Sequence, residues 1–194
     1  MIPRHLLIGT AVMLVIVLAM GMYLRHMSRA AYEMQRFADD TRPVTPPASG
    51  PTESVTLYVA DDGTGELHAQ VAKIPMPGGR QQRAEELLRA LLRIYQQPDS
   101  PHPLPAAADL RSVYLIDPGV AVVDMNSVFA DQHRSGILVE QLTVDSIVQT
   151  LGINVPGITR IRILVEGDSR DNLAGHVDLT DSFDVSSTVQ ASAQ

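Results

Sequence analysis

Two pairs of aspartate and histidine have the residue types and spacing that bind divalent metal ions. His176 and Asp178 are two residues apart in a segment that we expect to be a strand, so their side chains share a face. Asp131 and His133 have the same spacing. Four such ligands suit zinc or a similar ion. A simpler interpretation is that His176 makes a turn hydrogen bond after Gly175. We therefore expect no metal site and keep His176 and Asp178 as the candidates.

Two polar loops show a weaker similarity to cation sites. Residues 61–66 read DDGTGE, but they lack the alternating oxygen ligands and the distal glutamate of a calcium loop. A hairpin turn explains them better. Residues 167–172 form a second polar loop, in which Asp168 and Asp171 are at most a weak cation site.

No set of residues points to an enzyme. Ser127 and Ser135 lie near His133 in the sequence, but no Gly-x-Ser-x-Gly turn is present, and no glycine-rich phosphate loop precedes a helix. The chain contains no cysteine, which removes thiolate nucleophiles, disulfides and cysteine-ligated metals. We expect neither catalysis nor a cofactor.

Residues 6–24 are apolar without a charged side chain, which predicts a membrane anchor. Nineteen helical residues span roughly 28 Å, close to the hydrocarbon core of a bilayer. A cleavable signal peptide has a shorter core and small residues behind it, whereas GMYLR follows here. We expect an uncleaved single-pass anchor in residues 1–29 of a bacterial cell membrane protein. Its layout favours an extracytoplasmic C-terminal domain, although basic residues flank both ends of the apolar run.

Changes in composition along the sequence divide the remaining chain into three parts. A proline-rich linker occupies residues 30–53, a folded domain residues 54–185, and a small polar tail residues 186–194, which we expect to be disordered. The net charge is −7 and the basic residues are scattered, so we expect no nucleic-acid partner. The absence of tryptophan argues against a carbohydrate-stacking cleft.

Hydrophobic periodicity predicts an α+β domain with the order β-β-α-β-β-α-β-β. One mixed sheet with both helices packed on one face would bury both amphipathic stripes. In one strand, Arg160 and Arg162 project together from the face opposite Ile161 and Ile163, which makes this arginine pair the candidate interaction site. The expected strands cover residues 55–60, 67–74, 110–117, 120–125, 159–166 and 176–179, and the expected helices cover residues 81–96 and 137–151.

The order and spacing of four passages resemble the GerMN domain family of sporulation and spore-germination proteins. The passages are VTLYV at residues 55–59, RAEELLRALL at 83–92, SIVQTL at 146–151 continuing through PG to IRILVEG at 161–167, and LAGHVDL at 173–179. The resemblance implies an extracytoplasmic, non-enzymatic domain similar to the ring-building motifs of secretion systems. The chain departs from the lipoproteins of this family because it has an apolar anchor in place of a lipidated cysteine and one domain copy in place of two.

Three functional hypotheses follow. The first is a membrane-anchored assembly domain that binds envelope proteins or itself in an envelope, sporulation or germination complex. The alternative is a module that senses a small molecule or peptidoglycan fragment in a concave pocket, and the candidate places for it are the loops at residues 98–109 and 126–136. A divergent metal-dependent enzyme is the third, and it would depend on His176.

Overall fold

The strands form two separate sheets in the computed structural model, which describes residues 20, 50–116 and 118–186. The α+β class is confirmed, but the single mixed sheet that we expected is divided in two. β1 (Thr52–Asp61) and β2 (Glu66–Pro75) form an antiparallel hairpin of their own. The second sheet has the order β3-β4-β5-β6 and contains β3 (Leu110–Ile116), β4 (Val120–Met125), β5 (Arg160–Val165) and β6 (Phe183–Asp184).

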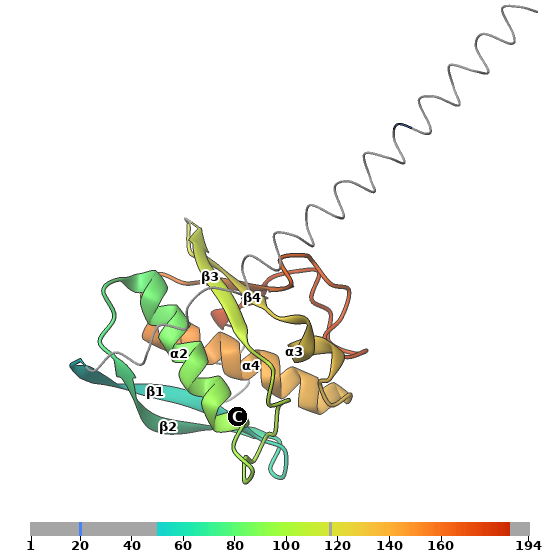
Figure 1. The fold of residues 1–194 in the computed structure, drawn as a ribbon, viewed down its shortest axis with the longest axis horizontal. Helices are drawn as coiled ribbons and strands as arrows, with labels where there is room; N and C mark the ends of the chain where they lie inside the picture. The colour runs from blue at the N-terminus through green and yellow to red at the C-terminus, as the bar shows by residue number, and fades with distance from the viewer. Residues whose placement is uncertain (1–19, 21–49, 117, 187–194) are drawn as a thin grey trace, which may run out of the picture. The chain divides into compact units, whose positions relative to one another are not determined.

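Two long helices lie between the hairpin and the second sheet (Figure 1). α2 (Arg80–Tyr95) contacts β3 and both hairpin strands, whereas α4 (Ile137–Asn154) contacts the hairpin and β5. Both helices therefore cover one face of the second sheet, as expected, while their other sides cover the hairpin. A short helix that we did not predict, α3 (Ser127–Asp131), follows β4, and the Asn126 side chain caps its N-terminus.

The inner face of the second sheet follows the predicted alternation. Ile161 and Ile163 on β5 are fully buried, whereas Arg160 and Arg162 are exposed on the opposite face. β5 pairs in parallel with β4, and α4 lies in the connection between these two strands. The amphipathic helix is also confirmed, because every apolar residue that we placed on its inner face is buried: Ala84, Leu87, Leu88, Leu91, Leu92 and Tyr95.

α4 is buried on more sides than a helix with a single apolar stripe would be. Leu138, which we expected to be inside, is 54% exposed. Gly152 does not end the helix as we expected, since α4 continues to Asn154. A Cβ atom at Gly152 would lie 2.2 Å from Val185 Cγ1, so the missing side chain lets the C-terminal segment cross α4 in close contact.

Polar side chains of α4 close the outer edge of β1. The Thr150 hydroxyl accepts the Tyr58 N–H, the Ser146 hydroxyl donates to the Tyr58 carbonyl, and Asn154 donates to the Thr56 carbonyl. These three residues recur at helical spacing on one side of α4. They satisfy backbone groups that an adjacent strand would otherwise pair.

The end of the domain differs from the sequence expectation. Residues 176–179, which we expected to be the closing strand, form a loop with an isolated bridge between Asn172 and Asp178. β6 instead pairs with β5 a few residues later. The physical reason is that backbone N–H groups of this loop donate to the carboxylate of Glu140 and not to a strand.

The predicted anchor, and most of the predicted linker and tail, lie outside the described residues. Among the residues that are described, no helix is long and apolar enough to cross a membrane. The anchor at residues 6–24 and the domain limits therefore remain predictions.

Candidate functional site

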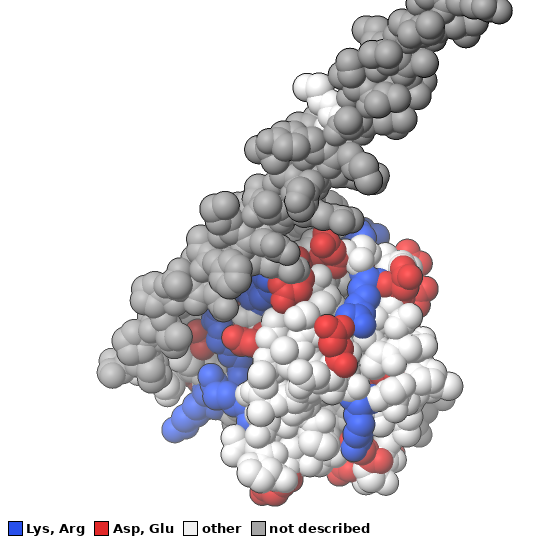
Figure 2. Space-filling model, turned by 45° about the vertical axis from the view of Figure 1, so that its right-hand side comes forward, with Lys and Arg blue, Asp and Glu red and all other residues white. Residues whose placement is uncertain are grey.

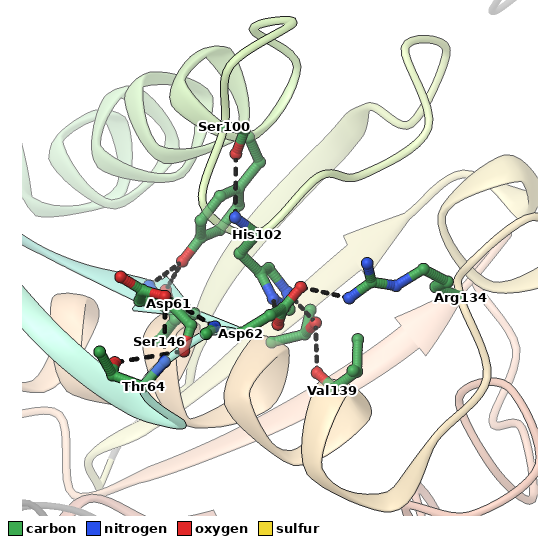
Figure 3. Close-up of polar contacts among 12 residues, drawn as sticks. Asp61, Asp62, Thr64, Ser100, His102, Arg134, Val139 and Ser146 are labelled. Atoms are coloured by element: carbon green, nitrogen blue, oxygen red, sulfur yellow. Dashed lines mark hydrogen bonds and ion pairs between the residues drawn. The ribbon is translucent and has the colours of Figure 1, made fainter.

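A buried polar cluster joins four segments beside α4 (Figure 3). Asp62 comes from the turn of the β1–β2 hairpin, His102 from the proline-rich loop after α2, and Thr143 from α4. His133 and Arg134 come from the segment between α3 and α4. The structure thus brings together residues 98–109 and 126–136, the two loops named as candidate places for a pocket.

The cluster contains an aspartate–histidine–threonine relay. His102 Nδ1 donates to Asp62 Oδ1 over 2.6 Å, and His102 Nε2 lies 2.7 Å from Thr143 Oγ1. This is the order of groups that activates a hydroxyl nucleophile, since the acid and the hydroxyl use opposite ring nitrogens. On the other side, His133 Nε2 lies 2.8 Å from the same hydroxyl, and Asp62 also forms an ion pair with Arg134.

The hydroxyl and the first imidazole of this relay are enclosed within the domain. His102 and Thr143 are completely buried, and the Thr143 hydroxyl donates to the Val139 carbonyl. The cavity beside Thr143, lined by apolar side chains together with Tyr95, has a volume of about 10 Å³. That is close to the smallest space for one water molecule, whereas small-molecule pockets typically have roughly 300 Å³ or more. The cluster fastens the hairpin and two loops to α4.

Burial also determines the charge of the cluster. It lowers the pKa of His102, although the hydrogen bond and charge of Asp62 act in the opposite direction. Burial likewise lowers the pKa of His133. Burial raises the pKa of Tyr95 to about 12, despite its hydrogen bonds with the Ala60 amide and Ser146. Burial thus works against the charged forms of both imidazoles and of the phenol.

A second buried group, the carboxylate of Glu140, binds the loop that contains His176. Glu140 is fully buried and accepts the N–H groups of Gly136, Ala174, His176 and Val177, together with His176 Nδ1 over 2.8 Å. Burial by itself raises the pKa of Glu140, but these hydrogen bonds outweigh it and lower the pKa to about 2. The ionised side chain holds the loop after Asn172 against the start of α4.

The candidate metal ligands are engaged in other contacts. His176 Nδ1 contacts Glu140, and Asp178 Oδ1 accepts both the amide and the hydroxyl of Thr180. Within residues 50–116 and 118–186, no three histidine or carboxylate side chains form a group that could hold a metal ion. Ser135 Oγ lies 3.4 Å from His176 Nδ1, the same nitrogen that contacts Glu140, so these residues do not form a relay through opposite nitrogens.

The polar loops identified in the sequence are local turns. Asp61 Oδ1 accepts the N–H groups of Gly63 and Thr64 within the hairpin turn. The loop after β5 begins with Gly167, whose N–H donates to Asp124 Oδ1. The Ser127 amide donates to Glu166.

Arg160 and Arg162 lie on the outer face of the second sheet, away from both long helices. In the strand register, Ile116, Val120 and Arg160 form one row, and Tyr114, Val122 and Arg162 form the next. Tyr114 and Ile116 are 54% and 53% exposed. The Arg162 guanidinium donates to the Ser169 hydroxyl, 3.4 Å away.

Charge is mixed over the surface that Figure 2 shows, where acidic and basic side chains lie beside one another around an uncharged area. Ion pairs within the described residues include Arg170 with Asp131 and Arg89 with Glu85. The outer sheet face combines the exposed side chains of Tyr114 and Ile116 with Arg160 and Arg162.

Comparisons with known proteins agree with the hairpin, helix and sheet arrangement. A family model named Germane, described as sporulation and spore germination, matches residues 56–171, and the chain belongs to this family. Its domain is a GerMN-like domain.

One solved structure shows the same fold at low sequence identity. The tandem GerMN domains of the sporulation protein GerM from Bacillus subtilis are 21% identical with a TM-score of 0.53, and the match covers 69% of this chain and 46% of that one. A protein described as a lipoprotein from Clostridium perfringens is 23% identical over 73% of this chain and 93% of its own, with a TM-score of 0.47. This chain thus spans less than half of the tandem structure. No curated protein matches the chain.

Sequence reasoning missed the central residues of both buried clusters. Thr143 and Glu140 lie on a segment that we predicted to be an amphipathic helix, and neither residue was named. One signal was available: residues 137–151 are apolar on nearly all sides, and such a helix is buried all round. The polar residues on the buried sides of such a helix then need internal partners.

Proposed function

We propose that this protein is a membrane-anchored, extracytoplasmic assembly domain that binds envelope proteins and does not catalyse a reaction. Membership in the sporulation and spore germination family supports the envelope role. The apolar run at residues 6–24 supports the anchor, and the lipoprotein from Clostridium perfringens suggests the same location.

The absence of catalysis is supported by the way the polar side chains are used. The relay at Thr143 is buried next to a cavity of about 10 Å³, and Glu140 is saturated with backbone donors. Neither arrangement presents a reactive atom to a substrate. A muropeptide is many times larger than this cavity.

The observation that carries the proposal is the uncovered outer face of the second sheet. No helix packs on this face among the described residues, and it exposes Tyr114 and Ile116 beside Arg160 and Arg162. Aromatic and arginine side chains are enriched in protein interfaces, and an exposed apolar area with a polar rim is typical of a binding surface.

Site-specific photocrosslinking of the full-length protein in its native membrane tests the proposal. A photoreactive residue at Tyr114 should yield a discrete adduct with an envelope protein, and Arg162→Glu should reduce the adduct at least several-fold. The matched control is a photoreactive residue at Asp99, which is also exposed but lies in the loop after α2. If Tyr114 and Asp99 give the same diffuse background, the outer sheet face is not the binding surface.

Membrane topology is tested with the same chain, since it contains no cysteine. A single Asp99→Cys variant should react with a membrane-impermeant maleimide in cells whose inner membrane is intact. Labelling only after the inner membrane is broken would place the domain in the cytoplasm and overturn the extracytoplasmic assignment.

A further inference from the structure

The two outer edges of the β1–β2 hairpin differ in how their backbone groups are satisfied. The β1 edge is closed by side chains, as Thr150 and Ser146 meet the Tyr58 backbone and the Tyr95 hydroxyl accepts the Ala60 amide. The β2 edge has no such cover from any described residue. Natural proteins usually protect a long strand edge, because unpaired N–H and C=O groups recruit another strand.

The hydrogen-bond pattern identifies which β2 residues face outward. The Met76 N–H donates to the Pro51 carbonyl across the hairpin. Hydrogen-bonded pairs recur at every second residue of an antiparallel ladder, so Gln70 and Leu57 also exchange hydrogen bonds. The residues between them direct their N–H and C=O groups away from β1. These outward residues are Leu67, Ala69, Val71 and Lys73.

The outward edge is open and regular. The register with β1 has no bulge, and no proline occurs between Leu67 and Lys73. Val71 is 74% exposed, more than any other large apolar side chain among the described residues. Figure 1 shows β2 at the margin of the domain, with no other labelled element on its outer side.

We propose that β2 pairs with β2 of a second copy of this chain in antiparallel orientation, which forms a continuous four-stranded sheet. The outward residues are symmetric about Gln70. A two-fold axis at Gln70 therefore places Leu67 opposite Lys73 and Ala69 opposite Val71 in both directions. Each of the four outward residues then exchanges both backbone hydrogen bonds with its partner.

Side-chain chemistry and chain composition favour this register. It opposes no two like charges, since Lys73 lies across from Leu67, and Glu66 lies across from Ile74. A shift by two residues in one direction would place Pro75, which has no N–H, opposite Leu67. The self-complementary register thus pairs every outward N–H group of β2. The next outward residue, Pro75, has no N–H group to pair.

This inference rests on the proposed assembly function and names one partner and one surface for it. A backbone ladder of this length with few apolar side chains gives a weak dimer in solution. Anchoring both copies in one membrane would raise their effective concentration. The test therefore uses the full-length chain in membranes.

Cysteine crosslinking tests the register, because the natural chain has no cysteine. Gln70→Cys places two sulfurs across the axis in a non-hydrogen-bonded pair, with Cα atoms about 4.5 Å apart, within the range of a disulfide. The matched control is His68→Cys, which lies on the same face two residues away, so that its Cα atoms are about 14 Å apart. We expect a covalent dimer with Gln70→Cys and none with His68→Cys. Adding Ala72→Cys to His68→Cys should restore crosslinking, since these residues lie opposite each other.

A proline at the edge tests the hydrogen bonds. Val71→Pro removes an outward N–H and leaves pairing with β1 intact, whereas Val71→Ala keeps the N–H. Added to Gln70→Cys, the proline should reduce crosslinking at least tenfold and the alanine much less. Circular dichroism of each variant shows whether the domain is folded.

The outcomes separate this inference from the proposed function. If Gln70→Cys and His68→Cys crosslink equally or not at all, β2 self-pairing is overturned. Photocrosslinking from Tyr114 to an envelope protein would still support the assembly function. If both experiments fail in folded protein, both proposals fail.

Discussion

Replacing Glu140 by glutamine should lower the stability of the domain strongly and remove a pH dependence. Glu140 has a pKa of about 2 in the folded chain in place of its ordinary 4.5. Each tenfold difference in proton affinity corresponds to about 1.4 kcal/mol, so the ionised carboxylate stabilises the folded state by about 3 kcal/mol at neutral pH. For a domain of this size, that loss lowers Tm by roughly 10 °C.

The sign of the pH effect follows from the two pKa values. The unfolded chain takes up a proton at Glu140 near pH 4.5 and the folded chain only near pH 2, so the unfolded state binds more protons between them. The contribution is complete above pH 4.5 and is lost as the pH falls through 2. Urea unfolding of the wild type and of Glu140→Gln between pH 3 and 7 should show the difference shrinking as the pH falls.

Asp145→Asn is the matched control for this experiment. Asp145 lies on the same helix, but burial raises its pKa, despite its hydrogen bond with Gln141. The folded state therefore disfavours its charged form, and the same carboxylate-to-amide change should be neutral or stabilising at pH 7. The reasoning about the Glu140 cluster is wrong if the free energy of unfolding of Glu140→Gln lies within about 1 kcal/mol of the wild-type value. It is also wrong if Glu140→Gln and Asp145→Asn lose equal stability.

Three further changes test the buried contacts. Thr143→Val keeps the side-chain shape but removes the hydroxyl that both histidines contact. Urea unfolding should show that the free energy of unfolding falls by about 2 kcal/mol. An unchanged midpoint would contradict the role of this cluster in fastening the loops. Thr150→Val removes the acceptor for the Tyr58 amide and should destabilise by about 1–2 kcal/mol, and hydrogen exchange should show faster exchange at that amide than in the wild type. Gly152→Ala introduces a methyl group against Val185 and should destabilise by about 1–3 kcal/mol; the Val185→Ala change should recover part of this loss, and additive losses in thermal unfolding would refute the contact.

The sequence predicts the elements of this fold better than their arrangement. The alternation of Ile161 and Ile163 with arginines identifies a half-buried strand, because side-chain direction in a strand depends only on the local period. The division into two sheets is different. The local pattern of residues 55–74 does not predict what pairs with the outer edge of β1. In the structure, Thr150 and Ser146 of a helix bind this edge, where another strand could have paired.

The same limit applies to the candidate site. The sequence singled out His176, and the structure places it against Glu140, a residue of α4 that the sequence analysis did not name. His133 was named as a possible ligand or base, and it lies beside Thr143 in a buried cluster. Such partners are distant in the chain, so residue type alone selects the histidines but does not identify what they contact.

The closure of the β1 edge by α4 has a consequence for biosynthesis. The bonds from Ser146, Thr150 and Asn154 to β1 join residues that are 88 to 98 positions apart in the chain. While the polypeptide emerges from the ribosome, the hairpin is complete long before this helix exists, and both of its edges are exposed during that interval. Slow formation of such distant contacts prolongs the exposure. The nascent hairpin is therefore the segment on which a holding chaperone would act, and Ser146→Ala or Thr150→Val should lower the yield of soluble protein more than their effect on the finished fold requires.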